Sequence, residues 1–349
     1  MTQQSLIRKL PDGAIDIVGD IHGEIDALRD LLRHLGYDSQ GYHPENRRLV
    51  FIGDFIDRGI DSPAVVNTIR RLTDSGNALA ILGNHELNLL NNDQKDGSGW
   101  FFEKQRVREQ HRYLQYKIAN EKEKEEIINY INTLPIALEN SNLRIIHAAW
   151  LDKHIDTIRK LGNIDAKTAF ANFRSHAKQL EKQQVWYSQY IKEHEFYHQH
   201  HRDENFAMPY LKAVGQYDLY HGEANPMRAI TCGTECFAKT PFYAAGRWRF
   251  VTRQPWWEEY NDDIPVVIGH YWRQWYANSF VQKSLFNEPA NQWLGKKKNI
   301  FCVDFSIGAL WKTRMIPSVI SPKNCRLSAL RLPEKILIFN NGETAATQE

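Results

Sequence analysis

Five short apolar segments of this 349-residue chain each end at a side chain that can bind a metal ion. The segments are rich in aliphatic and β-branched residues, and in four of them a Gly comes just before that side chain. This pattern is typical of buried strands that end at one edge of a sheet. The five residues at these ends are Asp20, Asp54, Asn84, His147 and His270. If the five ends meet, their oxygen and nitrogen atoms form a metal centre.

Further polar residues stand close to these ends. His22 lies two residues after Asp20, and in extended backbone residues i and i+2 project to the same side, so both can reach one ion. A donor set of oxygen and nitrogen without thiolate favours Mn, Fe, Zn, Co or Ni over soft-metal sites. A carboxylate can bridge two such ions about 3.5–4 Å apart, the spacing of two-metal phosphoester hydrolases. The residue types therefore indicate hydrolytic metal chemistry.

The elements that must position these residues alternate between strand and helix. We predict strands at 14–18, 48–52 and 78–82, separated by a helix over 25–35 and a helix that begins at Ser62. Ser62 is a good N-cap and Pro63 suits the first helical position. A β-α-β-α-β unit of this kind predicts parallel strands joined by right-handed crossovers.

The remainder of the chain changes in character. Residues 101–132 and 152–212 are charged and helix-prone, and strand-like patterning returns from about residue 242. We expect a single catalytic domain over 1–349, a mixed α/β core in which the two helical segments are insertions.

Composition narrows the range of partners and compartments. The net charge of +2 gives no strong electrostatic case for nucleic acid or an anionic membrane. No stretch approaches the roughly 20 apolar residues of a membrane span, and the first residues show no secretory signal. The four cysteines contain no C-x-x-C pair, which suits a reducing cytoplasm. We therefore expect a cytoplasmic protein that binds neither membrane nor nucleic acid.

Five motifs occur here in one order: GDIHG at 19–23, GDFIDRG at 53–59, GNHE at 83–86, a strand ending at His147, and GH at 269–270. In these motifs the sequence resembles the calcineurin-like metallophosphoesterases, in particular the branch of phosphoprotein phosphatases and symmetrical diadenosine tetraphosphate hydrolases. The tail FCVDFSIGALW, with Asp304, is also similar. The resemblance implies an α/β fold, a β-sandwich of two mixed sheets flanked by helices.

The resemblance also implies a ligand set for two divalent cations, of which manganese is the first expectation. The implied ligands are Asp20 and His22 for the first metal, Asp54 as the bridge, and Asn84, His147 and His270 for the second. In such a site a water acidified by the two cations attacks phosphorus in line.

Three further roles follow from the same resemblance. His85 is implied as the general acid that protonates the leaving oxygen. It directly follows Asn84, and because neighbouring side chains diverge, it cannot easily reach the metal that Asn84 binds. Asp57 would orient protonated His85, and Arg58 would hold phosphate oxygens with its planar fork.

Other signals leave alternatives open. Relatives use a second phosphate-binding arginine, and Arg247, Arg249 and Arg253 are candidates, with Arg253 preferred. An aromatic-rich segment surrounds the last ligand and could stack a nucleobase or pack the insertion against the core, and we favour packing. Its members are Trp248, Trp256, Trp257, Tyr260, Trp272, Trp275 and Tyr276.

Three functions remain as hypotheses. The first is a serine/threonine phosphatase-like hydrolase of phosphomonoesters, with a phosphoprotein as substrate. The second is a hydrolase of dinucleoside polyphosphates, with a nucleotide as substrate, since the shared motifs do not separate the two. The third is an inactive metal-binding regulatory protein, which is less favoured because every implied ligand and His85 are present.

Overall fold

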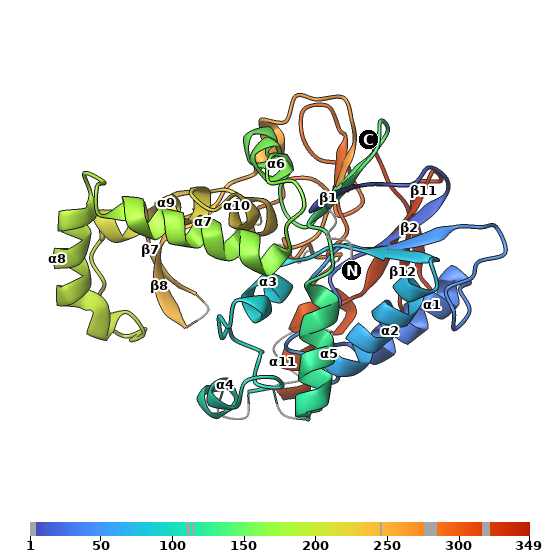
Figure 1. Cartoon of the computed structure of the whole chain (residues 1–349), viewed down its shortest axis with the longest axis horizontal. Helices are drawn as coiled ribbons and strands as arrows, with labels where there is room; N and C mark the ends of the chain where they lie inside the picture. Colours follow the sequence, from blue (N-terminus) through green and yellow to red (C-terminus); the bar gives the residue numbers. More distant parts are fainter. Residues whose placement is uncertain (1–4, 110–111, 114, 245, 276–284, 316–321) are drawn as a thin grey trace.

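The computed structural model describes residues 5–109, 112–113, 115–244, 246–275, 285–315 and 322–349. In these residues two mixed sheets form the core and helices flank them (Figure 1). The strand order is β1-β5-β6-β9-β10 in one sheet and β13-β12-β11-β2-β3-β4 in the other. The strands are β1 (Ile7–Lys9), β2 (Ile15–Val18), β3 (Arg48–Phe51), β4 (Ala78–Ala80), β5 (Ala137–Glu139), β6 (Arg144–Ile146), β7 (Glu235–Ala244), β8 (Arg247–Arg253), β9 (Val266–Ile268), β10 (Ile300–Cys302), β11 (Ser328–Leu332), β12 (Ile336–Phe339) and β13 (Thr344–Ala346).

Parallel pairing brings the strand ends of the site to common edges. β2, β3 and β4 are parallel neighbours, with Val18 opposite Phe51 and Phe51 opposite Ala80. The predicted β-α-β-α-β unit is therefore confirmed. In the second sheet β6 and β9 are also parallel, with Ile145 opposite Val267, so the residues after these two strands leave the sheet side by side.

Side-chain alternation explains why these runs are apolar throughout. Ile17 and Val50 pack in one cluster with Val267 of the other sheet, which places them between the sheets. Val18 and Phe51 belong instead to the cluster that includes the flanking helices. Both faces of these strands are buried, as is usual for parallel strands.

The helices are α1 (Ile25–Leu35), α2 (Ser62–Asp74), α3 (Asn84–Leu90), α4 (Glu103–Arg108), α5 (Glu121–Ile131), α6 (Asp152–Arg159), α7 (Ala166–Glu181), α8 (Tyr187–Tyr197), α9 (Lys212–Glu223), α10 (Pro226–Cys232) and α11 (Leu310–Met315). Short 3-10 turns are η1 (His198–His200), η2 (Trp256–Glu258), η3 (Ile307–Ala309) and η4 (Pro322–Asn324). Among the described residues, no helix is both long and apolar enough to cross a membrane.

The start of α2 corrects one prediction. Asp61, not Ser62, is the N-cap, and its carboxylate accepts a hydrogen bond from the Ala64 amide at 2.8 Å. Ser62 is the first helical residue, and its hydroxyl accepts instead from the amide of Asp57 at 2.9 Å. The prediction failed because both residues are good caps, and the serine serves the loop that carries the site.

The segment from α6 to β8 extends away from the two sheets (Figure 1). Ala169 of α7 and Ile230 of α10 belong to the main core, whereas Val214 of α9 and Phe250 of β8 lie in a small separate cluster. The hairpin begins at Glu235, earlier than the strand pattern predicted. We propose on this packing that the helical segments are insertions in one catalytic domain.

Candidate metal centre

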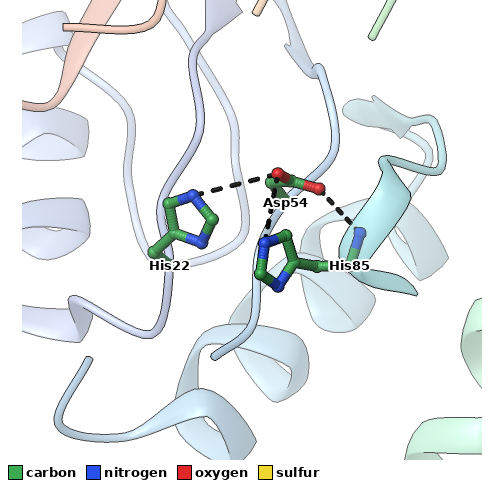
Figure 2. Close-up of side chains that lie close together, drawn as sticks. All are labelled: His22, Asp54 and His85. Atoms are coloured by element: carbon green, nitrogen blue, oxygen red, sulfur yellow. Dashed lines mark hydrogen bonds and ion pairs between the residues drawn. The ribbon is translucent and has the colours of Figure 1, made fainter. Parts of the chain in front are cut away.

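The residues at the five strand ends meet in the structure. His22, Asp54 and His85 bring potential ligand atoms within 4.8 Å of one another, and Asp54, His147 and His270 do the same. Asp54 belongs to both groups, and Figure 2 shows it between His22 and His85. All five side chains are buried, with at most 7% of each exposed. A carboxylate common to two groups of nitrogen donors is the arrangement that a pair of metal ions requires.

Distances around Asp54 show how close the donors lie. Its Oδ2 is 3.3 Å from His147 Nε2, 3.8 Å from His22 Nε2 and 3.9 Å from His85 Nε2. Asn84 Oδ1 lies 3.3 Å from His147 Nε2. Asp20 Oδ2 lies 3.9 Å from His22 Nε2. Every residue predicted to bind a metal is therefore within reach of a shared centre.

Two glycines of the motifs are required by the carboxylates beside them. A Cβ on Gly83 would lie 2.2 Å from Asp54 Oδ1, and a Cβ on Gly269 would lie 2.2 Å from Asp20 Oδ1. No side chain larger than hydrogen fits at either position. These glycines allow the neighbouring backbone to approach the centre closely.

Left-handed backbone is concentrated at the site. His22, Asp54, Asp57, Arg58 and His270 all have φ between 48° and 74°. Such conformations cost roughly 1–3 kcal/mol each for residues other than glycine, and they cluster at functional sites. The surrounding fold must supply that free energy, and it does so through hydrogen bonds to the loops.

Glu86 provides several of those hydrogen bonds. Its Oε2 accepts from the amides of Asp54 at 2.8 Å and Gly83 at 2.9 Å, and its Oε1 accepts from Phe55 at 2.8 Å. Burial, followed by the charge of Asp54, raises the pKa of the Glu86 carboxyl to about 7. The sequence analysis gave this residue no role. Its signal was a glutamate at the third position of a helix, the position of a capping box.

The electrostatics of the site favour a bound cation. Burial, and then the nearby Asp304 carboxyl, raise the pKa of Asp20 well above its ordinary value. Burial lowers the pKa of His270 well below its ordinary value, which keeps the imidazole neutral and able to donate a lone pair. Burial opposes the charge of His147, but Asp54 and Asp20 raise its pKa to about 10. Clustered carboxylates and imidazoles without thiolate fit divalent cations.

A second chain of contacts leads away from the centre. His85 Nδ1 lies 2.5 Å from Asp57 Oδ2, as the proposed orienting contact requires. Trp100 Nε1 donates to Asp57 Oδ1 at 2.6 Å. Trp100 was missed because a single tryptophan in a loop carries no sequence signal. Asp57 is thus held from both sides, and the His85 ring with it.

Arg58 covers the open side of His22 and His85. Its Nη1 donates to His22 Nε2 at 2.9 Å and its Nη2 to His85 Nε2 at 3.1 Å. The guanidinium lies over the ring of Trp272, 5.0 Å from the ring centroid. The planar fork is thereby held at the edge of the centre.

Arg253 lies further out than the other predicted residues. Its guanidinium is 5.5 Å from the ring centroid of Tyr271, the residue after His270, and its charge contributes to the lowered pKa of His270.

The aromatic segment divides into two groups. Trp256, Trp257 and Tyr260 are buried members of the main core, which confirms the packing interpretation for these three. Trp272 serves the site through Arg58, and Tyr276 lies outside the described residues.

The comparison with known families agrees with this geometry. The model of the calcineurin-like phosphoesterases matches residues 13–200, more than half of the 349 residues. The chain belongs to the calcineurin-like phosphoesterase family, whose metal chemistry accounts for the His and Asp clusters described above.

Individual relatives match over shorter segments. The chain is 32% identical over 166 residues to bis(5'-nucleosyl)-tetraphosphatase PrpE [asymmetrical] of Oceanobacillus iheyensis, covering 44% of this chain and 61% of that protein. It is 32% identical over 139 residues to the symmetrical bis(5'-nucleosyl)-tetraphosphatase of Aromatoleum aromaticum, covering 40% and 45%. The matches thus span about half the length of these relatives. A structure of a cold-active protein-tyrosine phosphatase from a Shewanella species is similar with a TM-score of 0.46 and 16% identity, covering 98% of this chain and 83% of that one.

Proposed function

We propose that the protein hydrolyses phosphoesters with two divalent cations. Asp20 and His22 would hold the first, Asn84, His147 and His270 the second, and Asp54 would contact both. Manganese is the first metal to test. When bound, such cations neutralise the charge on phosphoryl oxygens and lower the pKa of a coordinated water.

The remaining residues bind the substrate and move a proton. Arg58 would pair with phosphate oxygens through two parallel hydrogen bonds, and its contact with Trp272 orients the fork. His85 would protonate the leaving oxygen from Nε2, because its Nδ1 is held by Asp57. A guanidinium 3.1 Å from Nε2 disfavours a metal cation at the same nitrogen, which supports the role of His85 as an acid rather than a ligand.

The observation that carries the proposal is the position of Asp54. It is common to both groups of donors, and His85 approaches it from the side on which Arg58 lies. One carboxylate therefore connects the cation sites to the residues that would handle phosphate and leaving group.

The proposed substrate is a phosphomonoester, with dinucleoside polyphosphates as the second candidate. Two relatives named as bis(5'-nucleosyl)-tetraphosphatases support the second candidate. Hydrolysis of p-nitrophenyl phosphate, a phosphopeptide and diadenosine tetraphosphate by the manganese-loaded protein compares them directly. Two bound metal ions without activity on any of the three would support the regulatory hypothesis instead.

His85→Ala tests the assignment of roles. Because a general acid typically contributes 10²- to 10⁴-fold, we expect kcat to fall by about that factor while the protein still binds two metal ions. Asp54→Asn should lose both metal binding and activity. Metal analysis of the purified variants distinguishes these outcomes, and loss of metal from His85→Ala would show that His85 is a ligand.

A further inference from the structure

The hairpin formed by β7 and β8 carries a row of arginines on one face. Its two strands pair antiparallel and lie beside α9 and α10 (Figure 1), beyond the residues that the family model matches. Side chains alternate along a strand, so Arg247, Arg249 and Arg253 share a face with Val251. Phe250 points to the other face, where it is fully buried against α9. We call the three arginines the arginine row.

The arginine row has no counter-ions among the described residues. Arg247, Arg249 and Arg253 form no ion pair or side-chain hydrogen bond there, although Asp218 and Glu235 lie near enough to influence Arg249. Burial, and then the charge of Arg247, lower the pKa of Arg249 to about 10. Like charges held together without partners are unfavourable, and an anion would relieve that repulsion.

A fourth arginine increases the excess of positive charge. Arg228 of α10 lies close enough to influence Glu235 together with Arg249 and Arg253. Four arginines against the two carboxylates of Asp218 and Glu235 leave a formal charge of +2 on this face.

The arginine row begins beside the metal centre. Arg253 stands over the ring of Tyr271 and is close enough to His270 to lower its pKa. Six residues separate Arg253 from Arg247, a distance of about 20 Å along a strand. An anion that reaches the centre can therefore extend along the row.

We propose that the arginine row is a second anion subsite, which binds phosphate groups of the substrate beyond the phosphorus that is attacked. This inference rests on the proposed hydrolytic function and names its substrate class: a chain of linked phosphates rather than a single phosphate. Guanidinium groups pair with phosphate oxygens through two hydrogen bonds at once. A single phosphate at the metal centre would leave Arg247 and Arg249 without partners.

Selectivity between substrates tests the proposal. Arg249→Gln should lower the ratio of kcat/KM for diadenosine tetraphosphate to kcat/KM for p-nitrophenyl phosphate by about 10-fold or more, as expected for one charge-assisted hydrogen bond. Arg249→Lys, which keeps the charge, should recover part of that ratio. Arg174→Gln, at an exposed arginine of α7, is the control and should not change it. An equal ratio in wild type and Arg249→Gln would overturn the subsite.

Binding without catalysis separates this inference from the proposed function. Calorimetric titration of the metal-free protein with inorganic tripolyphosphate should show binding that weakens with salt and weakens at least about 10-fold in Arg249→Gln. If the wild type hydrolyses nothing but this difference remains, the hydrolytic proposal fails while the anion subsite stands. Equal binding by wild type, Arg249→Gln and Arg174→Gln would overturn the subsite, whatever the activity.

Discussion

At the residue scale, the site depends on side chains that touch neither metal nor substrate. Asp57 is held between the Trp100 indole and the His85 ring. Both contacts are buried, where hydrogen bonds are less weakened by water. The orientation of His85 therefore depends on a tryptophan 43 residues along the chain from Asp57.

Trp100→Phe tests this dependence. The change removes the hydrogen bond to Asp57 and leaves one carboxylate oxygen unsatisfied, so the His85 imidazolium is held less firmly. We expect kcat to fall about 10-fold, with a shift in the acid-side limb of the pH–rate profile and unchanged metal content. The measurement is kcat against pH on p-nitrophenyl phosphate.

Trp293→Phe is the matched control for that change. Trp293 is 2% exposed and its indole donates to Thr347 Oγ1 at 2.9 Å. It should lose a comparable free energy of unfolding without altering the pH profile. If the two variants have the same profile, Trp100 only stabilises the fold.

These residues show what the sequence could predict at this scale. The site residues Asp20, Asp54 and His270 follow apolar strands and stand beside glycines, a pattern visible without a structure. Glu86 and Trp100 act through contacts with backbone amides and with Asp57. Contacts of that kind depend on how loops fold over one another, which periodicity does not encode.

At the element scale, the loop before α4 is tied to the site by one carboxylate. Glu109 Oε1 accepts from the amides of Gly97 at 2.8 Å and Gly99 at 3.2 Å. The carbonyl of Gly97 in turn accepts from the amide of Arg58 at 3.0 Å. Glu109 thereby supports the loop that fixes the Arg58 backbone.

Glu109 makes stability depend on pH. Burial raises the pKa of its carboxyl from the ordinary value to about 7, so the folded state binds this proton more tightly than the unfolded chain. Its contribution to the free energy of unfolding is fully present below about pH 4.5 and is lost as the pH rises through 7. We expect that loss to be about 1–3 kcal/mol.

Glu109→Gln isolates this contribution, because an amide oxygen can still accept from both glycine amides but does not titrate. Urea denaturation at several pH values should show that wild type loses stability relative to the variant between pH 4.5 and 7. Parallel curves for the two proteins would contradict the raised pKa.

Prediction of the elements succeeded where the pattern was strong and local. The three parallel strands and α1 follow directly from their apolar periodicity. The hairpin was placed too late because β7 is mostly exposed and shows no apolar alternation at its start. Its pairing with β8 has an irregular register between Phe237 and Phe242, which also hides the pattern.

At the scale of the whole molecule, stability is unevenly distributed. The main core joins both sheets and the helices around them, and it includes Ala169 and Ile230 of the inserted segment. The outer part of that segment has its own small cluster around Val214 and Phe250. Few buried apolar contacts mean a low free energy for local opening.

Hydrogen exchange of two helices of equal length tests this distribution. α1 and α8 each have 11 residues, but six residues of α1 are buried and none of α8 is. Burial of apolar side chains is what stabilises helices of this length. We therefore expect α8 amides to exchange at least about 100-fold faster than those of α1, a difference of roughly 3 kcal/mol in opening free energy.

Mass spectrometry of deuterated peptides resolves the two helices in one experiment. Tripolyphosphate adds a second comparison, because an anion on the arginine row would join β8 to the ligand and slow exchange in the hairpin more than in α1. Equal protection of α1 and α8 would instead mean that α8 is covered in solution, for example by a second copy of the chain. The inserted segment would then be an interface, and its low burial in a single chain would no longer indicate low stability.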